Sequence, residues 1–482
     1  MKLLTAKKLT RAMANASSYD EWKAAALAHD KANGKERWKK LDNSNQYDHV
    51  SVRGRLDRLR ALRSRHDYRG LLFSLNEGIH GNVGGMGKAV LYGQAMFGTK
   101  QLIDDYVEEI VEALELLASP EVDTISFEEK LDFFRRAHHC FGCSAFMMSG
   151  SGALMFFHVG VIKALVEQQL LPDILSGSSG GAIVGSLACT HSDTDLARIL
   201  SADHLAEQIC VESRGLMPGV IRQELLLELI QKLIPDLTFE EAYARSGRAL
   251  NVSISPAEAL QTSRLMNAIT SPTVRIHTAV QASAAVPGIF PPVTLEARDN
   301  LGARQAYLPS RQWVDGSMSD DLPAKRLARL YGVNHHIVSQ TNPLVLPFLN
   351  DGHTAPGTFG LLRGAAGRTA REWINTYAKL LHRTVHQRSA AAYVASSALS
   401  LINQNYNGDI NILPGNRFPN PLKLLALPTE DELRTMIRNG EHAAWPRMEM
   451  IRVQTKIGKT LAQLRKGFED EHVSRQPESL AS

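Results

Sequence analysis

The chain has 482 residues and a net charge of +4, with 44% hydrophobic and 22% charged residues. This composition is ordinary for a globular protein with a hydrophobic core, and it excludes collagen-like, wholly disordered and disulfide-scaffold chains. At roughly 150 residues per domain, the length indicates about two or three domains. There are four cysteines, and the N-terminal segment MKLLTAKKLTR lacks the apolar core of a signal peptide. We therefore expect a cytoplasmic protein.

Residues 1–140 are predicted to form a mainly helical N-terminal region. Apolar residues between Leu102 and Leu117 recur at helical spacing opposite an acidic face. Ser126 and Glu129 have the spacing of a capping box, which predicts the start of the next helix.

The positive charge is concentrated near the N-terminus. Residues 1–70 hold 17 Lys or Arg against 8 Asp or Glu, and six arginines between Arg53 and Arg65 are interleaved with leucines. We interpret this segment as a solvated helix that packs its leucine stripe on its own domain. The alternatives are a cationic helix on an anionic membrane surface and a helix that binds nucleic acid.

Residues 144–340 are predicted to form an α/β domain with a central, mainly parallel sheet, because short apolar runs alternate there with glycine-rich turns and helical stretches. The predicted strands are Ala145–Met148, Asp173–Leu175, Leu250–Ile254 and His336–Ser339. The window Phe146–Val166 is long enough to span a bilayer, but its glycines, serines and Lys163 favour a buried strand, loop and helix instead.

Residues 341–482 are predicted to be a mainly helical C-terminal extension with a disordered tail. A glycine-rich stretch, residues 352–367, precedes a long helix expected from about Thr369, and the tail covers residues 474–482.

The most specific motif is Gly177-Ser178-Ser179-Gly180-Gly181, which fits G-x-S-x-G with Ser179 at its centre. It lies between a predicted strand and a predicted helix, which is the context that a nucleophile elbow requires. The glycines permit a strained turn, and the helix N-terminus favours developing negative charge. We therefore predict that Ser179 is a nucleophile.

A serine nucleophile needs hydrogen-bond donors for the oxyanion that forms on its substrate. A second glycine loop, Ser149-Gly150-Ser151-Gly152-Ala153, lies about 25 residues upstream and could supply backbone N–H groups. The same loop is a broken G-x-G-x-x-G, but Met155 occupies the third glycine position and Asp173 precedes its strand, so a dinucleotide site is disfavoured.

The nucleophile also needs a base, and the residues leave two alternatives open. In a Ser-Asp-His arrangement, the histidine would come from His335, His336, His353, His382 or His386. Alternatively, a partly buried carboxylate acts directly on the serine, and Asp315-Gly316 after an apolar run fits this role. Asp320 and Asp321 are nearby, but Asp321-Leu322-Pro323 is more typical of a helix N-cap.

Together these motifs resemble the patatin-like phospholipase family, and in particular its branch of fungal and plant triacylglycerol lipases. Further segments in the expected order extend this resemblance over most of the chain. They are Tyr19–Trp22, Trp38-Lys39, Tyr47-Asp48, Gly98-Thr99-Lys100, His158–Val161, Ala282–Gly288, Ile337–Pro343 and Tyr406–Ile410. The branch carries an N-terminal helical region of uncharacterised function. The resemblance implies the patatin-like three-layer fold.

The resemblance also implies a Ser-Asp dyad without histidine, with Ser179 as nucleophile and Asp315 of Asp315-Gly316-Ser317 as base. The oxyanion loop maps to Gly150, Ser151 and Gly152, and the elbow glycines are Gly177 and Gly181. Ser151 and Met155 replace glycines of the family pattern, which bears on the space for an acyl chain.

We therefore expect a lipase or phospholipase that cleaves fatty acyl esters through an acyl-enzyme. No cofactor, metal or nucleic acid is expected, because the pair Cys140 and Cys143 beside His138 and His139 is only half of a zinc site. The expected binding partner of the protein is its lipid ester substrate, at the periphery of a membrane or of a lipid droplet. The alternative is a catalytically weak lipid-binding or scaffold protein of the same fold.

Overall fold

The computed structural model describes residues 2–79, 82–210, 221–258, 261–343, 345–346, 349, 408–416, 420, 423–424 and 426–475. The glycine-rich stretch, the helix predicted from Thr369 and nearly all of the predicted disordered tail lie outside the described residues.

The described residues form a seven-stranded sheet in the order β4-β3-β2-β1-β8-β9, and β7 also pairs with β3. The strands are β1 (Cys143–Met148), β2 (Ile174–Gly177), β3 (Ala249–Pro256), β4 (Arg264–Met266), β7 (Trp313–Asp315), β8 (Val333–Ser339) and β9 (Ile410–Ile412). The neighbouring strands β3, β2, β1, β8 and β9 are parallel to one another, whereas β4 and β7 run antiparallel to β3. A separate hairpin joins β5 (Leu295–Arg298) to β6 (Arg304–Tyr307). The predicted α/β class and its four strands are confirmed.

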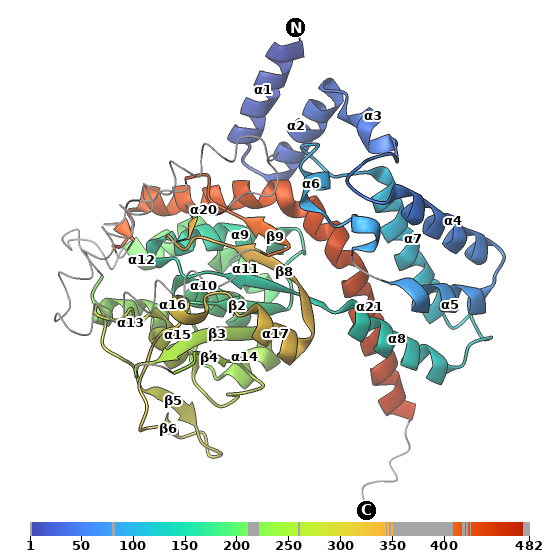
Figure 1. Cartoon of the computed structure of the whole chain (residues 1–482). Coiled ribbons are helices and arrows are strands. Elements are labelled where there is room, and N and C mark those ends of the chain that lie inside the picture. Colours follow the sequence, from blue (N-terminus) through green and yellow to red (C-terminus); the bar gives the residue numbers. More distant parts are fainter. Residues whose placement is uncertain are drawn as a thin grey trace, which may run out of the picture.

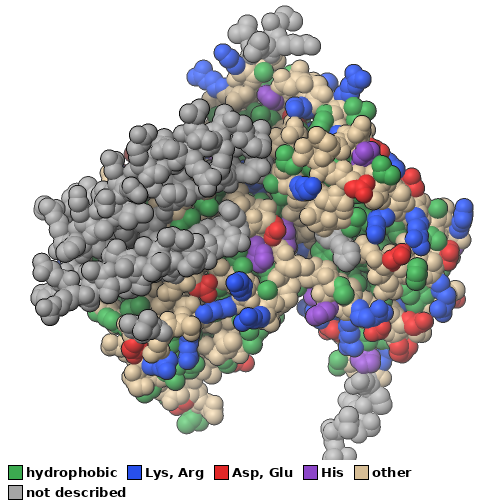
Figure 2. All heavy atoms as spheres, viewed as in Figure 1, with side chains coloured by type: hydrophobic (Ala, Val, Ile, Leu, Met, Phe, Trp, Pro, Cys, Tyr) green, Lys and Arg blue, Asp and Glu red, His purple; other side chains and the backbone are tan. Residues whose placement is uncertain are grey.

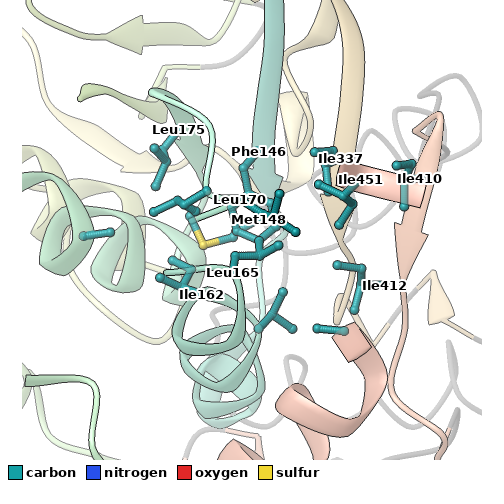
Figure 3. Close-up of a cluster of buried hydrophobic side chains, with 14 of the residues drawn as sticks. Phe146, Met148, Ile162, Leu165, Leu170, Leu175, Ile337, Ile410, Ile412 and Ile451 are labelled. Atoms are coloured by element: carbon teal, nitrogen blue, oxygen red, sulfur yellow. The ribbon is translucent and has the colours of Figure 1, made fainter. Parts of the chain in front are cut away.

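Both faces of this sheet are buried, as a parallel sheet requires. Because side chains alternate along a strand, Phe146 and Met148 of β1 face one core cluster, while Ala145 and Met147 face another. Figure 3 shows Phe146 and Met148 among side chains from β2, β8, β9 and the helix below them. The second cluster includes Leu327, from the helix that covers the opposite face.

Helices form the layers on either side of the sheet. Those of the central part are α9 (Met155–Glu167), α10 (Gly180–Thr190), α11 (Asp193–Ile199), α12 (Ala202–Cys210), α13 (Gln223–Leu233), α14 (Phe239–Ser246), α15 (Ile276–Ala284), α16 (Ser317–Asp320) and α17 (Ala324–Tyr331). After the sheet come α20 (Glu430–Ala444) and α21 (Met448–Arg475). Helix and strand layers therefore alternate, in agreement with the three-layer prediction (Figure 1).

The N-terminal region is helical, as predicted, and lies beside the sheet domain with α21 between them (Figure 1). Its longer helices are α1 (Lys2–Asn15), α2 (Tyr19–Ala32), α4 (His49–Ser64), α5 (Tyr68–Gly78), α7 (Gln101–Ala118) and α8 (Phe127–Phe141). The shorter ones are α3 (Lys35–Lys40) and α6 (Ala89–Tyr92). The capping box of Ser126 and Glu129 is formed at the start of α8.

The arginine-rich segment is α4, and it packs as a domain helix. Leu56 and Leu59 are buried, and Arg63 Nε lies 2.9 Å from Glu109 Oε1 of α7. Arg60 and Arg58 also form ion pairs, with Glu109 and Glu77. Figure 2 shows basic and acidic side chains interspersed over this part of the surface. The packed-helix interpretation is confirmed, and most of these arginines have partners within the region.

The family motifs of the N-terminal region have structural roles. The buried Lys100 side chain donates to the carbonyl oxygens of Trp38 and Leu41, each at 2.8 Å. Its ammonium also lies 4.2 Å from the centre of the Trp38 ring. Burial lowers the pKa of Lys100. These contacts tie the start of α7 to α3 and to the segment after it.

Residues beyond 341 complete the sheet domain. β9 extends the sheet beside β8, and α20 packs against α9 at very short range. A Cβ atom on Gly160 of α9 would overlap the carbonyl oxygen of Ile437, and one on Gly440 of α20 would overlap that of Phe157. Two facing glycines thus allow the two helix backbones to touch.

Replacing Gly160 by alanine is therefore expected to destabilise the fold by about 1–3 kcal/mol, the usual cost of overpacking. The matched control is Gly467→Ala in α21, where an added Cβ would meet nothing within 4 Å. That exposed helical change should be neutral or stabilising by up to about 1 kcal/mol. Urea unfolding measures both, and equal effects of the two substitutions would contradict the close packing of α9 on α20.

The apolar window Phe146–Val166 divides into the end of β1, the glycine loop and α9, as predicted. No helix among the described residues combines the length and apolar character that a bilayer span requires.

Candidate active site

Ser179 lies at a sharp turn between β2 and α10. Its φ of 53° and ψ of −122° are strained for a residue with a side chain, and such strain is typical of functional sites. A Cβ on Gly177 would overlap the carbonyl oxygen of Gly181, and one on Gly181 would lie 2.7 Å from the carbonyl oxygen of Met148. Both elbow glycines are thus required by close backbone approach.

Asp315 lies at the end of β7 and is buried beside this turn. The backbone N–H of Ser317 donates to Asp315 Oδ1 at 2.8 Å. Burial raises the pKa of Asp315 to about 6, although hydrogen bonds from Ser317 and from the Ser179 side chain oppose the shift. The structure therefore brings Ser179 and Asp315 together, 136 positions apart in sequence.

Helix α15 and the residues after it hold both members of this pair in place. The N–H of Ser179 donates to Ser283 Oγ at 2.9 Å, and Ser283 Oγ in turn donates to the carbonyl of Ser253 at 2.7 Å. The N–H of Asp315 donates to the carbonyl of Ala285 at 3.0 Å. Sequence reasoning missed this role of Ser283 and Ala285, although both belong to the motif Ala282–Gly288 that contributed to the family resemblance.

The glycine loop after β1 lies against the elbow, with its two ends fixed. The N–H of Gly150 donates to Asp321 Oδ1 at 2.7 Å, and the N–H of Ala153 donates to the carbonyl of Leu424 at 2.7 Å. Between these anchors, the N–H groups of Ser151 and Gly152 have no acceptor among the described residues. Gly152 adopts a φ of +51°, which turns the loop.

The elbow contributes a further N–H group from Gly180, which also has no acceptor among the described residues. Gly152, Ser179 and Gly180 line the same cavity. A Cβ on Gly180 would overlap Ser151 Oγ, so the missing side chain of Gly180 makes room for Ser151. The serine that departs from the family pattern is thus accommodated by the elbow.

The N-cap interpretation of Asp321 is wrong. Helix α17 begins at Ala324, its N-cap is Pro323, and no side chain caps it. The Asp321 carboxylate is instead buried under the glycine loop, where Asn342 Nδ2 donates to Oδ2 at 2.9 Å. Its burial raises the pKa of Asp321 to about 7. A local motif could not reveal these partners, which lie on distant segments.

Histidines do not contact the pair among the described residues. His335 interacts with Ser144 Oγ and with Gln454 Oε1, at the end of the sheet opposite the elbow. His336 pairs with Asp409. The other three candidates, His353, His382 and His386, lie outside the described residues.

An apolar cavity of about 80 Å³ opens onto Ser179. It is walled by side chains that include Phe156, Ile183, Ile209, Leu229, Phe290 and Leu427, and no described residue that lines it is charged. Phe290, which follows the Ala282–Gly288 motif, is thus part of the cavity wall. Trp313, in contrast, is a fully buried core residue away from the cavity lining.

Cys140 and Cys143 do not form part of a metal centre within the described part of the chain, where no group of three or more His, Cys, Asp or Glu side chains could hold an ion. Cys189 is a buried core thiol, and burial raises its pKa to about 12.

Comparison with known proteins identifies the family to which this fold and site belong. A family model described as "Patatin-like phospholipase" matches residues 146–328, and one described as "Domain of unknown function (DUF3336)" matches residues 3–139. Triacylglycerol lipase ptl3 of Schizosaccharomyces pombe is 32% identical over 91% of this chain and 93% of its own length. The chain belongs to the patatin-like phospholipase family, as the motifs predicted.

Other relatives are longer. Triacylglycerol lipase 4 of Saccharomyces cerevisiae is 33% identical over 91% of this chain but over 50% of its own length. The chain therefore spans about half the length of that relative and of two from Cryptococcus neoformans. Among solved structures, VipD from Legionella pneumophila overlaps 68% of this chain and 67% of its own, with a TM-score of 0.31 and 14% identity.

Proposed function

We propose that this chain is a serine acyl hydrolase that cleaves fatty acyl esters of lipids through a dyad of Ser179 and Asp315. The main support is one observation: the Ser179 side chain, on a strained backbone, hydrogen-bonds the buried Asp315 carboxylate, and Ser179 lines an apolar cavity. An activated serine needs such a base, and a fatty acyl chain needs such a cavity.

In the proposed acylation step, Ser179 Oγ attacks the ester carbonyl while Asp315 accepts the hydroxyl proton. The carbonyl oxygen becomes an oxyanion, which the N–H groups of Gly152 and Gly180 stabilise, with Ser151 as a further donor. Gly150 is not assigned as a donor because its N–H already binds Asp321. The tetrahedral intermediate collapses, and the departing alcohol takes the proton from Asp315.

In deacylation, Asp315 acts again as base and then as acid, with water in place of the serine hydroxyl. Asp315 accepts a proton from water as the water oxygen attacks the acyl-enzyme, and the proton then returns to Ser179 Oγ when the fatty acid leaves. A base with a pKa near the working pH suits both proton transfers, and burial places Asp315 in that range. The proposal requires no cofactor and no metal.

Triacylglycerol is the substrate class that we propose first, with phospholipid second. The cavity walls are apolar and uncharged among the described residues, which suits an acyl chain. Relatives at 32% and 33% identity are named triacylglycerol lipases. We further propose action at the periphery of a membrane or lipid droplet in the cytoplasm, where the free thiols of Cys140, Cys143 and Cys189 stay reduced.

Labelling with a fluorophosphonate tests the nucleophile directly, because only an activated serine reacts with this probe. We expect one adduct per chain, on the peptide that contains Ser179, and none on Ser179→Ala or on the heat-denatured wild type. Hydrolysis of emulsified triacylglycerol and of phospholipid vesicles by the same preparation then ranks the two substrate classes. Absence of labelling on a folded wild type would instead favour the catalytically weak lipid-binding protein.

A further inference from the structure

Asp321 connects three segments that build the candidate site. Its Oδ1 accepts from the N–H of Gly150 in the glycine loop, and its Oδ2 accepts from the Asn342 side chain after β8. Its backbone carbonyl accepts from the hydroxyl of Ser178, the residue before the nucleophile, at 3.1 Å. The glycine loop and the end of β8 therefore share the buried Asp321 carboxylate, and the elbow binds the backbone of the same residue.

The Asn342 end of this connection is itself anchored. The N–H of Asn342 donates to Ser149 Oγ at 3.0 Å, and the N–H of Thr341 donates to the same oxygen at 2.8 Å. Ser149 directly precedes Gly150, so the start of the glycine loop is held from both sides. Small shifts of Asp321 are consequently resisted by a surrounding network that is itself buried.

The contact with Gly150 decides which amides of the loop lack an acceptor among the described residues. One anchor binds the N–H of Gly150 and the other binds that of Ala153, and they leave the N–H groups of Ser151 and Gly152 between them. Without an acceptor at Asp321, Gly150 would keep a buried N–H unsatisfied, at a cost of about 1–3 kcal/mol. The loop would lower this cost by rotating its peptides, and that rotation would move the neighbouring donors.

We propose that Asp321 is a positioning residue, which fixes the glycine loop so that the N–H groups after Gly150 meet the oxyanion. This inference rests on the proposed ester hydrolysis at Ser179. It adds a residue that touches neither substrate nor nucleophile side chain and that acts on the transition state through the loop. Its substitution should therefore lower kcat more than it changes KM.

The experiment compares three variants of the full chain with the wild type on a p-nitrophenyl ester. Asp321→Leu keeps the approximate size but removes the acceptor, whereas Asp321→Asn keeps one oxygen for Gly150. Asp320→Asn is the matched control, since its carboxylate lies one position away and pairs with Arg326 at 3.3 Å. Fluorophosphonate labelling to completion counts the competent sites, so that kcat is given per site.

We expect Asp321→Leu to lower kcat per site roughly 10²-fold, the effect of losing an oxyanion donor, with KM changed by less than about threefold. Inhibition by a trifluoromethyl ketone, whose adduct carries an oxyanion, should weaken by a similar factor. Asp321→Asn should recover about tenfold of this loss, and Asp320→Asn should match the wild type. A merely structural role would reduce the number of labelled sites but would leave kcat per site and the inhibition constant unchanged.

Wild-type kcat per site in Asp321→Leu would overturn the positioning role while leaving the proposed hydrolysis intact. If Asp321→Leu does not fold, Asp321→Ala, which also removes the acceptor for Gly150, decides, and an unchanged kcat in that variant overturns the role as well. A wild type that is folded, unlabelled and inactive removes both proposals together, so the two failures are distinguishable.

Discussion

Ser179→Ala is expected to lower kcat for ester hydrolysis at least about 10⁴-fold, because loss of a nucleophile removes the covalent pathway and leaves only binding and the oxyanion donors. The fold should be unaffected. The hydroxyl touches the Asp315 carboxylate, but the N–H of Ser179 makes the structural bond to Ser283 and survives the change. Initial rates on a p-nitrophenyl ester measure the loss, and circular dichroism checks the fold.

Ser178→Ala is the neighbouring control for this substitution. Its hydroxyl donates to the backbone carbonyl of Asp321, so its loss should perturb the site far less than loss of the nucleophile. We expect at most about a tenfold fall in kcat, in line with the loss of one neutral hydrogen bond. Equal activity of Ser179→Ala and the wild type would eliminate the nucleophile assignment, and inactivation by Ser178→Ala alone would relocate it.

The sheet was predictable because its signals are local. Short apolar runs bounded by glycines mark buried strands, and the ends of the four predicted strands differ from those in the structure by at most three residues. β7 was indicated only as a short apolar run that ends in Asp315, and β9 was not predicted as a strand. Each has three residues, and each is stabilised by a partner strand that is distant in sequence, β3 and β8. Three residues carry too little periodicity to identify a strand.

Parts of the site were predictable for the same reason. Ser179 and Asp315 belong to short motifs with a recognisable turn on each side, and the structure places them in contact. The supporting residues Ser283 and Asp321 have no such signature. A serine in a helix or an aspartate before Leu-Pro is ordinary in sequence, and its role appears only when its hydrogen-bond partners from other segments are known. Local reasoning therefore made Asp321 a helix cap.

Asp315→Asn is expected to lower kcat/KM by at least about 10²-fold, because an amide cannot accept the Ser179 proton. The wild type gives the matching pH dependence. Asp315 must be ionised to act as a base, and its pKa is raised to about 6 by burial. Activity should therefore be constant above about pH 7 and fall about tenfold per pH unit well below 6. An acid limb near the ordinary aspartate pKa of about 4 would contradict the burial of the base.

The same substitution is expected to stabilise the fold at high pH. A carboxyl whose pKa rises from about 4 in the unfolded chain to about 6 in the folded chain binds its proton more tightly when folded. The free energy of unfolding is therefore highest, as far as Asp315 is concerned, below pH 4. It falls by up to about 3 kcal/mol as the pH rises through 6 and the buried carboxyl ionises. Asparagine carries no charge and avoids this loss, while its side-chain oxygen can still accept from the N–H of Ser317.

In urea unfolding, the free energy of unfolding of Asp315→Asn should exceed that of the wild type by about 2–3 kcal/mol at pH 8 and by much less at pH 4. An equal difference at pH 4 and pH 8 would show that the ionised Asp315 carboxylate does not destabilise the fold. The expected pattern would mean that the wild-type fold is less stable because it keeps this base ionised.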